Sequence, residues 1–428
     1  MKDFKSTEYE LECVATGHKF KDSGWDLADK DCNEPSLVRA IYSKKQIKFK
    51  GEDWGIYKFA DWMPIRRTLK GSAPTITYKS EKLAEKLGLK NLYISFSGYW
   101  PEKGAGMTTC SFKETEAFTV CGRLPEGEKR ILVVSSAGNT ARAFARVCSE
   151  NNIPLLLTVP EDNIGALWFE KPLNDCVKLI CTPKGSDYFD AIALGDAACK
   201  SPMFFAEGGA KNVARRDGMA TTVLSAAQVI GRIPDCYFQA IGSGTGTIAA
   251  WEANLRLIED GRFGNHKMKL FPSQNAPFLP MHDAWKADSR ALLPMDDDKA
   301  REDAQIIDAK VLSNRRPPYS LKGGVFDALK DAGGDVEAVT NEELREAAKL
   351  FLETEGIDIH PAAAVALAGM MKTFEAGKMP ADAVAMLNIT GGGEMRFKKD
   401  HECVYLKPSL IANASDEGVV EKIENLFK

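Results

Sequence analysis

The sequence predicts an α/β fold with two sheets, and three observations support this. From about residue 130, short β-branched and aliphatic runs alternate with longer amphipathic stretches. This alternation is typical of βαβ units, in which helices connect parallel strands. Loops of small residues follow several of these runs and lead into helices. The chain has 428 residues, a length that predicts two or three domains with a large buried core.

The individual elements follow from this alternation. Strands are expected at residues 131–134, 155–159, 177–182, 203–206, 236–241 and 385–389. Helices are expected at residues 140–150, 187–200, 221–230, 248–260, 341–353 and 362–375. Residues 274–319 are richer in Pro, Asp and Arg, which predicts a mobile, lid-like excursion on the surface.

The charge balance excludes several classes of function. Sixty acidic against 56 basic residues give a net charge of −4, and no long basic run occurs, so we expect no nucleic-acid partner. The start of the chain has no apolar signal region, and no apolar run approaches the ~20 residues that cross a bilayer. We therefore expect a cytoplasmic protein that acts on small molecules and has no membrane partner.

The ten cysteines are scattered from Cys13 to Cys403 without a Cys-x-x-Cys pair, so most are expected to be reduced core thiols. Residues 1–60 contain Cys13 and His18, which resemble half of a zinc ribbon. Tetrahedral coordination needs a second close pair of ligands, which this region does not show. We therefore expect no metal site.

Lys113 stands in the stretch Ser111-Phe112-Lys113-Glu114, where Ser111 and Glu114 have the spacing of a helix capping box. This spacing predicts that Lys113 lies in the first turn of a helix, where free backbone N–H groups disfavour a positive charge. A lysine kept partly neutral is nucleophilic and suits Schiff-base chemistry. The alternative is an ordinary solvated lysine near a helix start.

Two strand-to-helix junctions are rich in small residues. The segment 135–140 (Ser-Ser-Ala-Gly-Asn-Thr) offers backbone N–H groups to an anion such as a carboxylate, unless Asn139 or Thr140 is simply an N-cap. The segment 242–246 (Gly-Ser-Gly-Thr-Gly) suits a phosphate cradle. It lacks both the lysine of a P-loop and the Gly-x-Gly-x-x-Gly spacing of a dinucleotide site, so phosphate binding without a dinucleotide is favoured.

Thr390 follows the last strong strand and precedes three glycines. It is expected to present a neutral hydroxyl at the carboxyl end of that strand, the edge at which open α/β sheets bind ligands. Taken alone, a Thr-Gly turn is common.

In this order, the segments 111–113, 136–140, 242–246 and 390–392 resemble the fold-type II pyridoxal-phosphate enzymes, specifically their threonine synthase branch. The resemblance spans roughly residues 60–400 and implies a tryptophan synthase β-like fold with two open, twisted, parallel-sheet domains. It implies a homo-oligomer, and residues 1–60 look like a ribbon-like extension that has lost its metal ligands. The implied parts are a large cofactor-binding domain at 61–106 and 206–410, a small α/β domain at 107–205, and a C-terminal helix at 411–428.

The resemblance implies a pyridoxal 5′-phosphate cofactor, which Lys113 holds as an internal aldimine. It implies that Asn139 hydrogen-bonds the ring hydroxyl and that Thr390 faces the pyridine nitrogen. The cradle for the cofactor phosphate is then formed by Gly242, Ser243, Gly244, Thr245 and Gly246. The implied substrate-binding residues are Ser136, Ala137, Gly138 and Thr140.

Threonine synthases usually continue Ser-Phe-Lys with Asp-Arg, whereas this chain has Glu114, Thr115 and Glu116. In this it resembles the cysteate-forming group of the branch, archaeal enzymes that serve coenzyme M biosynthesis. The implied reaction is a β-replacement that converts O-phospho-L-serine and sulfite into L-cysteate and phosphate. The alternative is a threonine synthase acting on O-phosphohomoserine. An NAD-dependent oxidoreductase is disfavoured by the glycine spacing, and a regulatory protein without turnover is a third class.

A phosphorylated substrate and an anionic nucleophile require cations beyond the cofactor cradle. The candidates, each of which is more often a solvated surface charge, are Arg142, Lys171, Lys211, Arg215, Arg216, Arg315, Arg316 and Lys322.

Overall fold

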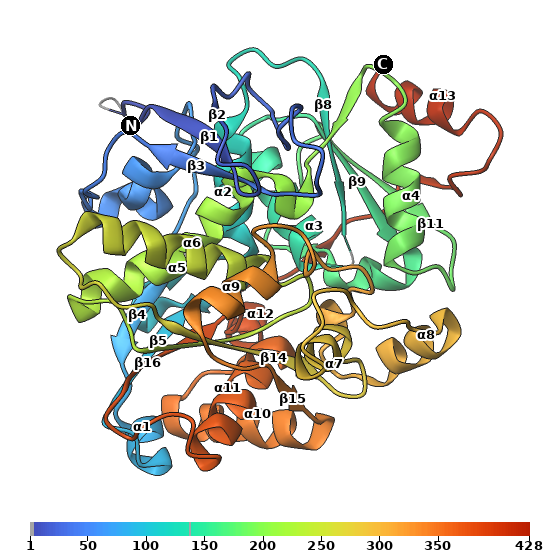
Figure 1. Ribbon diagram of the computed structural model, residues 1–428. Helices are drawn as coiled ribbons and strands as arrows, with labels where there is room; N and C mark the ends of the chain where they lie inside the picture. Colours follow the sequence, from blue (N-terminus) through green and yellow to red (C-terminus); the bar gives the residue numbers. More distant parts are fainter. Residues whose placement is uncertain (1–3, 137) are drawn as a thin grey trace.

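Two sheets of mainly parallel strands form the framework of the protein (Figure 1). The computed structural model describes residues 4–136 and 138–428. All neighbours in the larger sheet are parallel except β4 and β5. The order of its strands is β15 (Glu337–Val339), β14 (Lys269–Asn275), β13 (Cys236–Ala240), β16 (Val384–Ile389), β5 (Asn91–Phe96) and β4 (Ile76–Lys79).

The smaller sheet is parallel throughout. Its order is β12 (Phe204–Ala206), β8 (Ile131–Ser135), β9 (Leu155–Pro160), β11 (Val177–Thr182) and β18 (Leu410–Ile411). Strands such as β9 are buried along their whole length, as expected for a sheet covered on both faces. The expected α/β architecture with two parallel-sheet units is confirmed, while the proposed domain boundaries stay a prediction.

Helices connect and cover the strands. They are α1 (Lys82–Leu87), α2 (Lys113–Arg123), α3 (Asn139–Glu150), α4 (Tyr188–Ala198), α5 (Val213–Ile230), α6 (Thr245–Asp260), α7 (Pro280–Lys286), α8 (Asp297–Ile306), α9 (Val325–Ala332), α10 (Asn341–Glu355), α11 (Pro361–Glu375), α12 (Glu394–Asp400) and α13 (Val419–Glu424). Shorter 3₁₀ helices are η1 (Glu52–Trp62), η2 (Pro101–Lys103), η3 (Glu161–Ala166), η4 (Gly209–Lys211), η5 (Lys310–Leu312) and η6 (Asn425–Phe427). In the part of the chain that the structure describes, no helix is both long and apolar enough to cross a membrane.

Short strands complete the chain. The N-terminal extension folds into a three-stranded antiparallel sheet of β1 (Tyr9–Cys13), β2 (Lys19–Phe20) and β3 (Val38–Tyr42). Antiparallel pairs are formed by β6 (Tyr99–Trp100) with β7 (Ala105–Gly106), and by β10 (Trp168–Phe169) with β17 (Val404–Tyr405).

The N-terminal extension (residues 4–60) contacts both the end of α2 and the segment around the end of β12. Arg123, at the end of α2, donates to Asp22 Oδ2 at 2.9 Å and to Asn212 Oδ1 at 2.9 Å. The Trp25 indole donates to the Ala206 carbonyl at 3.0 Å. The Arg123 and Asp22 side chains are both buried, so each charge depends on the other as its partner.

Two differences from the expected elements have physical causes. α5 begins at Val213 and not at residue 221, because the Asn212 side chain caps it and its first two turns are almost entirely buried, so they show no amphipathic stripe. β14 was not expected because it carries Pro272, which is unusual inside a sheet. The predicted excursion at 274–319 contains α7, α8 and η5, and its mobility stays a prediction.

α2 and α5 approach closely because Gly218 lies at their contact. A Cβ there would lie 2.3 Å from the Thr115 carbonyl oxygen and 2.7 Å from Thr119 Oγ1. We predict that Gly218→Ala lowers the free energy of unfolding by roughly 1–3 kcal/mol, because the two helices must separate. Urea denaturation measures this, with Gly165→Ala as the control, since a Cβ at Gly165 meets nothing within 4 Å. Equal stabilities of the two variants would contradict the prediction.

Candidate active site

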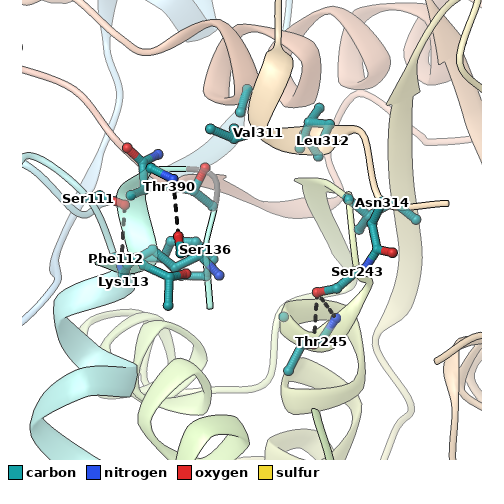
Figure 2. A pocket seen from close by; sticks show the side chains of 18 of the residues that line it. Ser111, Phe112, Lys113, Ser136, Ser243, Thr245, Val311, Leu312, Asn314 and Thr390 are labelled. Carbon is teal, nitrogen blue, oxygen red and sulfur yellow. Dashed lines mark hydrogen bonds between the residues drawn. The ribbon is translucent and has the colours of Figure 1, made fainter. Parts of the chain in front are cut away.

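The carboxyl ends of β8, β13 and β16 face one cavity. Figure 2 shows Ser111, Lys113, Ser136 and Thr390 on one side of it and Ser243 and Thr245 on the other. Every described residue of the expected site lines this cavity: Lys113, Ser136, Gly138, Asn139, Thr140, Gly242, Ser243, Gly244, Thr245, Gly246 and Thr390. Ala137 lies outside the described residues.

Lys113 is the first residue of α2, as expected, but the predicted capping box is wrong. The Lys113 amide, and not that of Glu114, donates to Ser111 Oγ at 3.3 Å. The buried Glu114 carboxylate accepts from the Thr109 amide at 2.7 Å and from Arg146 Nη1 at 2.7 Å. An ion pair with another helix therefore replaces the local cap, because a buried carboxylate needs a cationic partner.

Burial lowers the pKa of the Lys113 amine, while the Glu116 carboxylate, 3.3 Å from Lys113 Nζ, opposes that shift. Arg215 nearby lowers the pKa further. The direction agrees with the expectation of a partly neutral amine. Its main cause is burial rather than the free N–H groups of the helix start.

A backbone pairing holds the lysine segment against the turn that follows β16. The Phe112 amide donates to the Thr390 carbonyl at 2.9 Å, and the Gly392 amide donates to the Cys110 carbonyl at 3.1 Å. A Cβ at Gly391 would lie 2.4 Å from His360 Nδ1 and 2.9 Å from the Cys110 carbonyl oxygen, so only glycine fits there. This pairing brings Lys113 and Thr390 to the same wall of the cavity.

The loop 242–246 forms a cradle at the N-terminus of α6. Gly244 has a φ of 76°, and a Cβ on Gly246 would lie 2.4 Å from Gln239 Nε2, so both positions require glycine. The amides of Ser243, Gly244 and Gly246 donate to no other residue in the described part of the chain. Free amides at a helix start bind anions such as phosphate.

The N-terminus of α3 forms a second cluster of amides. Ser136 Oγ accepts from the amides of Gly138 and Ala141, at 3.1 Å each, and thereby caps the helix. Asn139 Oδ1 accepts from Arg142 Nη2 at 3.0 Å. This bond turns the Asn139 amide nitrogen away from Arg142, and among the described residues that nitrogen has no acceptor. These contacts suit a phosphorylated cofactor with a ring hydroxyl, so the residues present fit the cofactor that the resemblance implies.

Sequence reasoning missed several residues of the cavity wall: Tyr188, Gln239, Lys310, Val311, Leu312, Ser313, Asn314 and His360. Of the candidate cations, only Arg215 lines this cavity within the described ranges. Arg142 lines an adjoining cavity, which shares Asn139, Lys310 and His360 with the first. No local signal marks Tyr188, Lys310 or His360, because α4, η5 and the start of α11 bring them to the cavity from distant parts of the sequence.

His360 and Glu394 meet at the border of the two cavities, with Nε2 and Oε2 3.0 Å apart. Burial raises the pKa of the Glu394 carboxyl, but the partners His360 and Lys398 outweigh it and hold that pKa at about 2. His360 therefore lies beside an ionised carboxylate at neutral pH.

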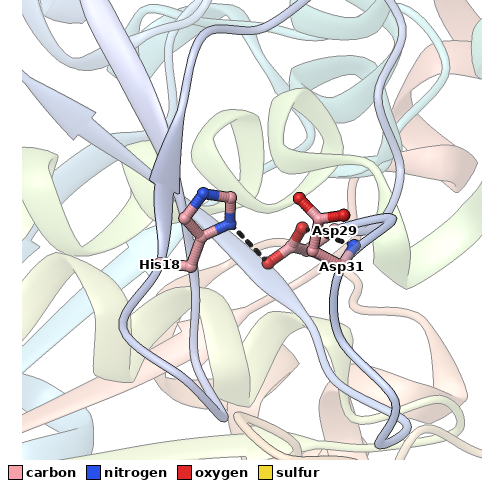
Figure 3. Close-up of side chains that lie close together, drawn as sticks. All are labelled: His18, Asp29 and Asp31. Atoms are coloured by element: carbon pink, nitrogen blue, oxygen red, sulfur yellow. Dashed lines mark hydrogen bonds and ion pairs between the residues drawn. The ribbon is translucent and has the colours of Figure 1, made fainter.

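Away from the cavity, His18, Asp29 and Asp31 gather in the N-terminal extension (Figure 3). Their possible ligand atoms lie within 4.8 Å of one another, and His18 Nδ1 is 3.0 Å from Asp29 Oδ2. The ion pair with His18 is sufficient reason for the position of Asp29. The expected absence of a metal stays a prediction.

Comparisons with known proteins agree with this geometry. Residues 69–391 match the family described as "Pyridoxal-phosphate dependent enzyme". A cysteate synthase of Methanosarcina acetivorans is 47% identical over 412 residues, which cover 96% of this chain and 98% of the relative. Another, of Methanosarcina mazei, is 45% identical over 96% of this chain and 99% of its own. Maize serine racemase has the same fold, with a TM-score of 0.58 and 15% identity over 76% of this chain and 91% of its own.

The Glu394 contacts predict a dependence of stability on pH. A carboxyl whose pKa falls from 4.5 to about 2 on folding contributes stability that is present above pH 4.5 and is lost as the pH falls toward 2. We predict that Glu394→Gln lowers the free energy of unfolding by roughly 1–2 kcal/mol at pH 6 and by less at pH 3. Urea denaturation at both pH values measures this. Glu375→Gln, at an exposed position of α11, is the control, and an equal loss at both pH values in Glu394→Gln would refute the assignment.

Proposed function

The chain belongs to the family of pyridoxal-phosphate dependent enzymes, and we propose that it is a cysteate synthase that converts O-phospho-L-serine and sulfite into L-cysteate and phosphate. The observation that carries this proposal is the likeness to cysteate synthases, at 47% identity over 98% of the length of one of them. The alternative, a threonine synthase, is not favoured by this likeness. The proposal includes a cytoplasmic location, which the lack of an apolar signal region predicts, and a homo-oligomer, which the sequence resemblance implies.

Four groups of the cavity are proposed to hold pyridoxal phosphate. Lys113 supplies the amine for covalent attachment, and the free amides of loop 242–246 receive the phosphate. Asn139 offers its amide nitrogen to the ring hydroxyl, and Thr390 presents a neutral hydroxyl to the ring nitrogen. When bound, the cofactor withdraws electrons from Cα of the substrate and so makes the Cα proton acidic.

The protein side chains then move protons and bind anions. Lys113, once displaced by the substrate amine, takes the Cα proton as a general base. The Cβ–O bond breaks and phosphate leaves with the electron pair. Sulfite brings its lone pair to Cβ and forms the C–S bond, and Lys113 returns the proton to Cα. One phosphate is released for each sulfite consumed, without a change in oxidation state that needs a further reactant.

Two anions require cations in the cavity wall. Arg215 is bound to Glu207 through Nε at 3.0 Å and Nη2 at 2.6 Å, so its charge is largely used inside the protein. Lys310 and His360 line the cavity on the side of η5 and α11. We assign Lys310 to these anions, and we assign the start of α3, with Ser136, Gly138 and Thr140, to the substrate carboxylate.

Lys113→Ala is predicted to abolish covalent cofactor attachment and to reduce turnover by roughly 10³-fold or more, because the nucleophile and the general base are both lost. Borohydride reduction followed by peptide mass spectrometry locates the modified lysine. Lys310→Ala, which removes another lysine of the same cavity, should still carry the adduct on Lys113. An adduct on the Lys113→Ala variant, or on a different lysine of the wild type, would overturn the assignment.

Product analysis distinguishes the two activities. With phosphoserine and sulfite we predict cysteate and one equivalent of phosphate, whereas O-phosphohomoserine should yield threonine at a rate at least about tenfold lower, since that route needs γ-elimination and further proton shifts. Mass spectrometry of both mixtures measures the products. Threonine as the dominant product refutes the proposed reaction but leaves the family unaffected.

A further inference from the structure

Four charged side chains form a chain of contacts that begins at Lys113, the proposed attachment point of the cofactor. Lys113 Nζ is 3.3 Å from Glu116 Oε2, and Glu116 Oε1 is 3.7 Å from Arg215 Nη2. Arg215 continues the chain of charges to Glu207, at 2.6 Å. Lys113 is 20% exposed, whereas the Glu116 side chain is fully buried. The Lys113 side chain therefore reaches the cavity, whereas the Glu116 carboxylate is buried inside the protein.

The two carboxylates have different partners. Glu207 receives both donors of the Arg215 fork, so this pair is satisfied by itself. Glu116 receives a hydrogen bond from Lys113 Nζ at 3.3 Å. Its other oxygen, Oε1, is buried and has no hydrogen-bond partner among the described residues. Among the described residues, the hydrogen bond that the Glu116 carboxylate accepts thus comes from the amine that the reaction uses.

We propose that Glu116 is a positioning residue that holds the Lys113 amine, and sets its proton affinity, whenever the lysine is not attached to the cofactor. This inference rests on the proposed function, in which Lys113 takes and returns the Cα proton. A buried amine alone is a weak base, because burial disfavours its charged form. A carboxylate at hydrogen-bond distance stabilises the ammonium group, so the amine can carry the proton until it is returned.

The other charged and polar groups around Lys113 do not replace Glu116. Arg215, from α5, opposes the ammonium charge, and Glu207, from the segment after β12, is bound to Arg215. Tyr188, from α4, lines the cavity. The Phe112 ring lies 4.8 Å from Nζ and adds only a modest attraction for the cation. Glu116 is therefore the group whose removal should change the lysine most.

α2 itself supplies a matched control. Glu114 is also buried, lies two residues before Glu116 and carries the same charge, but its carboxylate binds Arg146 and the Thr109 amide. Glu114→Gln therefore removes one buried negative charge from the same helix without touching the Lys113 amine. A general effect of losing a buried charge would appear in both Glu114→Gln and Glu116→Gln. The proposed effect on the Lys113 amine would appear only in Glu116→Gln.

The first experiment measures the pKa of Lys113 in the full-length chain freed of its cofactor. The rate at which an amine-acylating reagent labels Lys113 is followed against pH by peptide mass spectrometry. Glu116→Gln is expected to lower the midpoint of this titration by about one unit, because the anion that favours the ammonium form is lost. Glu114→Gln should leave the midpoint in place. An unchanged midpoint in Glu116→Gln, or an equal shift in both variants, overturns the proposal.

A second variant guards against a failure to fold. Glu116→Asp keeps the negative charge but shortens the side chain by one methylene, so the carboxylate lies farther from the Lys113 amine. We expect the labelling midpoint to move in the same direction as in Glu116→Gln, but by less. A larger shift in Glu116→Asp than in Glu116→Gln contradicts the proposal. Because the labelling needs neither substrate, it succeeds or fails independently of cysteate formation.

The holoenzyme provides a third readout, the dependence of kcat on pH with phosphoserine and sulfite. The pH limb that reports Lys113 should move in Glu116→Gln in the same direction as the labelling midpoint. A midpoint that moves while no cysteate forms even in the wild type refutes the proposed function and leaves the pairing of Glu116 with Lys113 intact. Cysteate formation by the wild type, together with an unmoved midpoint in Glu116→Gln, would support the proposed function and refute the pairing of Glu116 with Lys113.

Discussion

The backbone pairing between residues 110–112 and 390–392 is the constraint on which the site depends. It joins the start of α2 to the end of β16, so the amine and the neutral hydroxyl share one wall. Glycine at 391 and 392 permits this approach, since a Cβ at Gly392 would lie 2.6 Å from the Asp358 carbonyl oxygen. The same turn accepts the His360 amide at 3.0 Å and thus places the His360–Glu394 contact beside the cavity.

The phosphate cradle of the site was predictable from the sequence because it acts through its own backbone. Loop 242–246 needs small residues at a strand-to-helix junction, and five consecutive small residues in the sequence show this requirement directly. Residues that reach the cavity from separate helices were not predictable. Lys310 and His360 have no distinguishing neighbours in the sequence, and the contact of Glu116 with Lys113 depends on how deeply α2 is buried.

The fold was predictable where the hydrophobic period was regular, as in β8, β9 and β11. It was not predictable where tertiary contacts replace local rules. Glu114 has the spacing of a capping residue, yet its carboxylate pairs with Arg146, from α3, because a buried ion pair outweighs a local cap. The first half of α5 is buried nearly all round, and β14 tolerates Pro272, so neither shows the pattern of its class.

The pairing of residues 110–112 with residues 390–392 also bears on how the protein is made. Its two halves are separated by most of the chain, and closing so large a loop is entropically costly and slow. A ribosome-bound chain that already exposes Lys113 still lacks the surface against which that lysine is held. We therefore expect capture of the cofactor to be a late event in biosynthesis, because β16 must first leave the ribosome and enter the larger sheet.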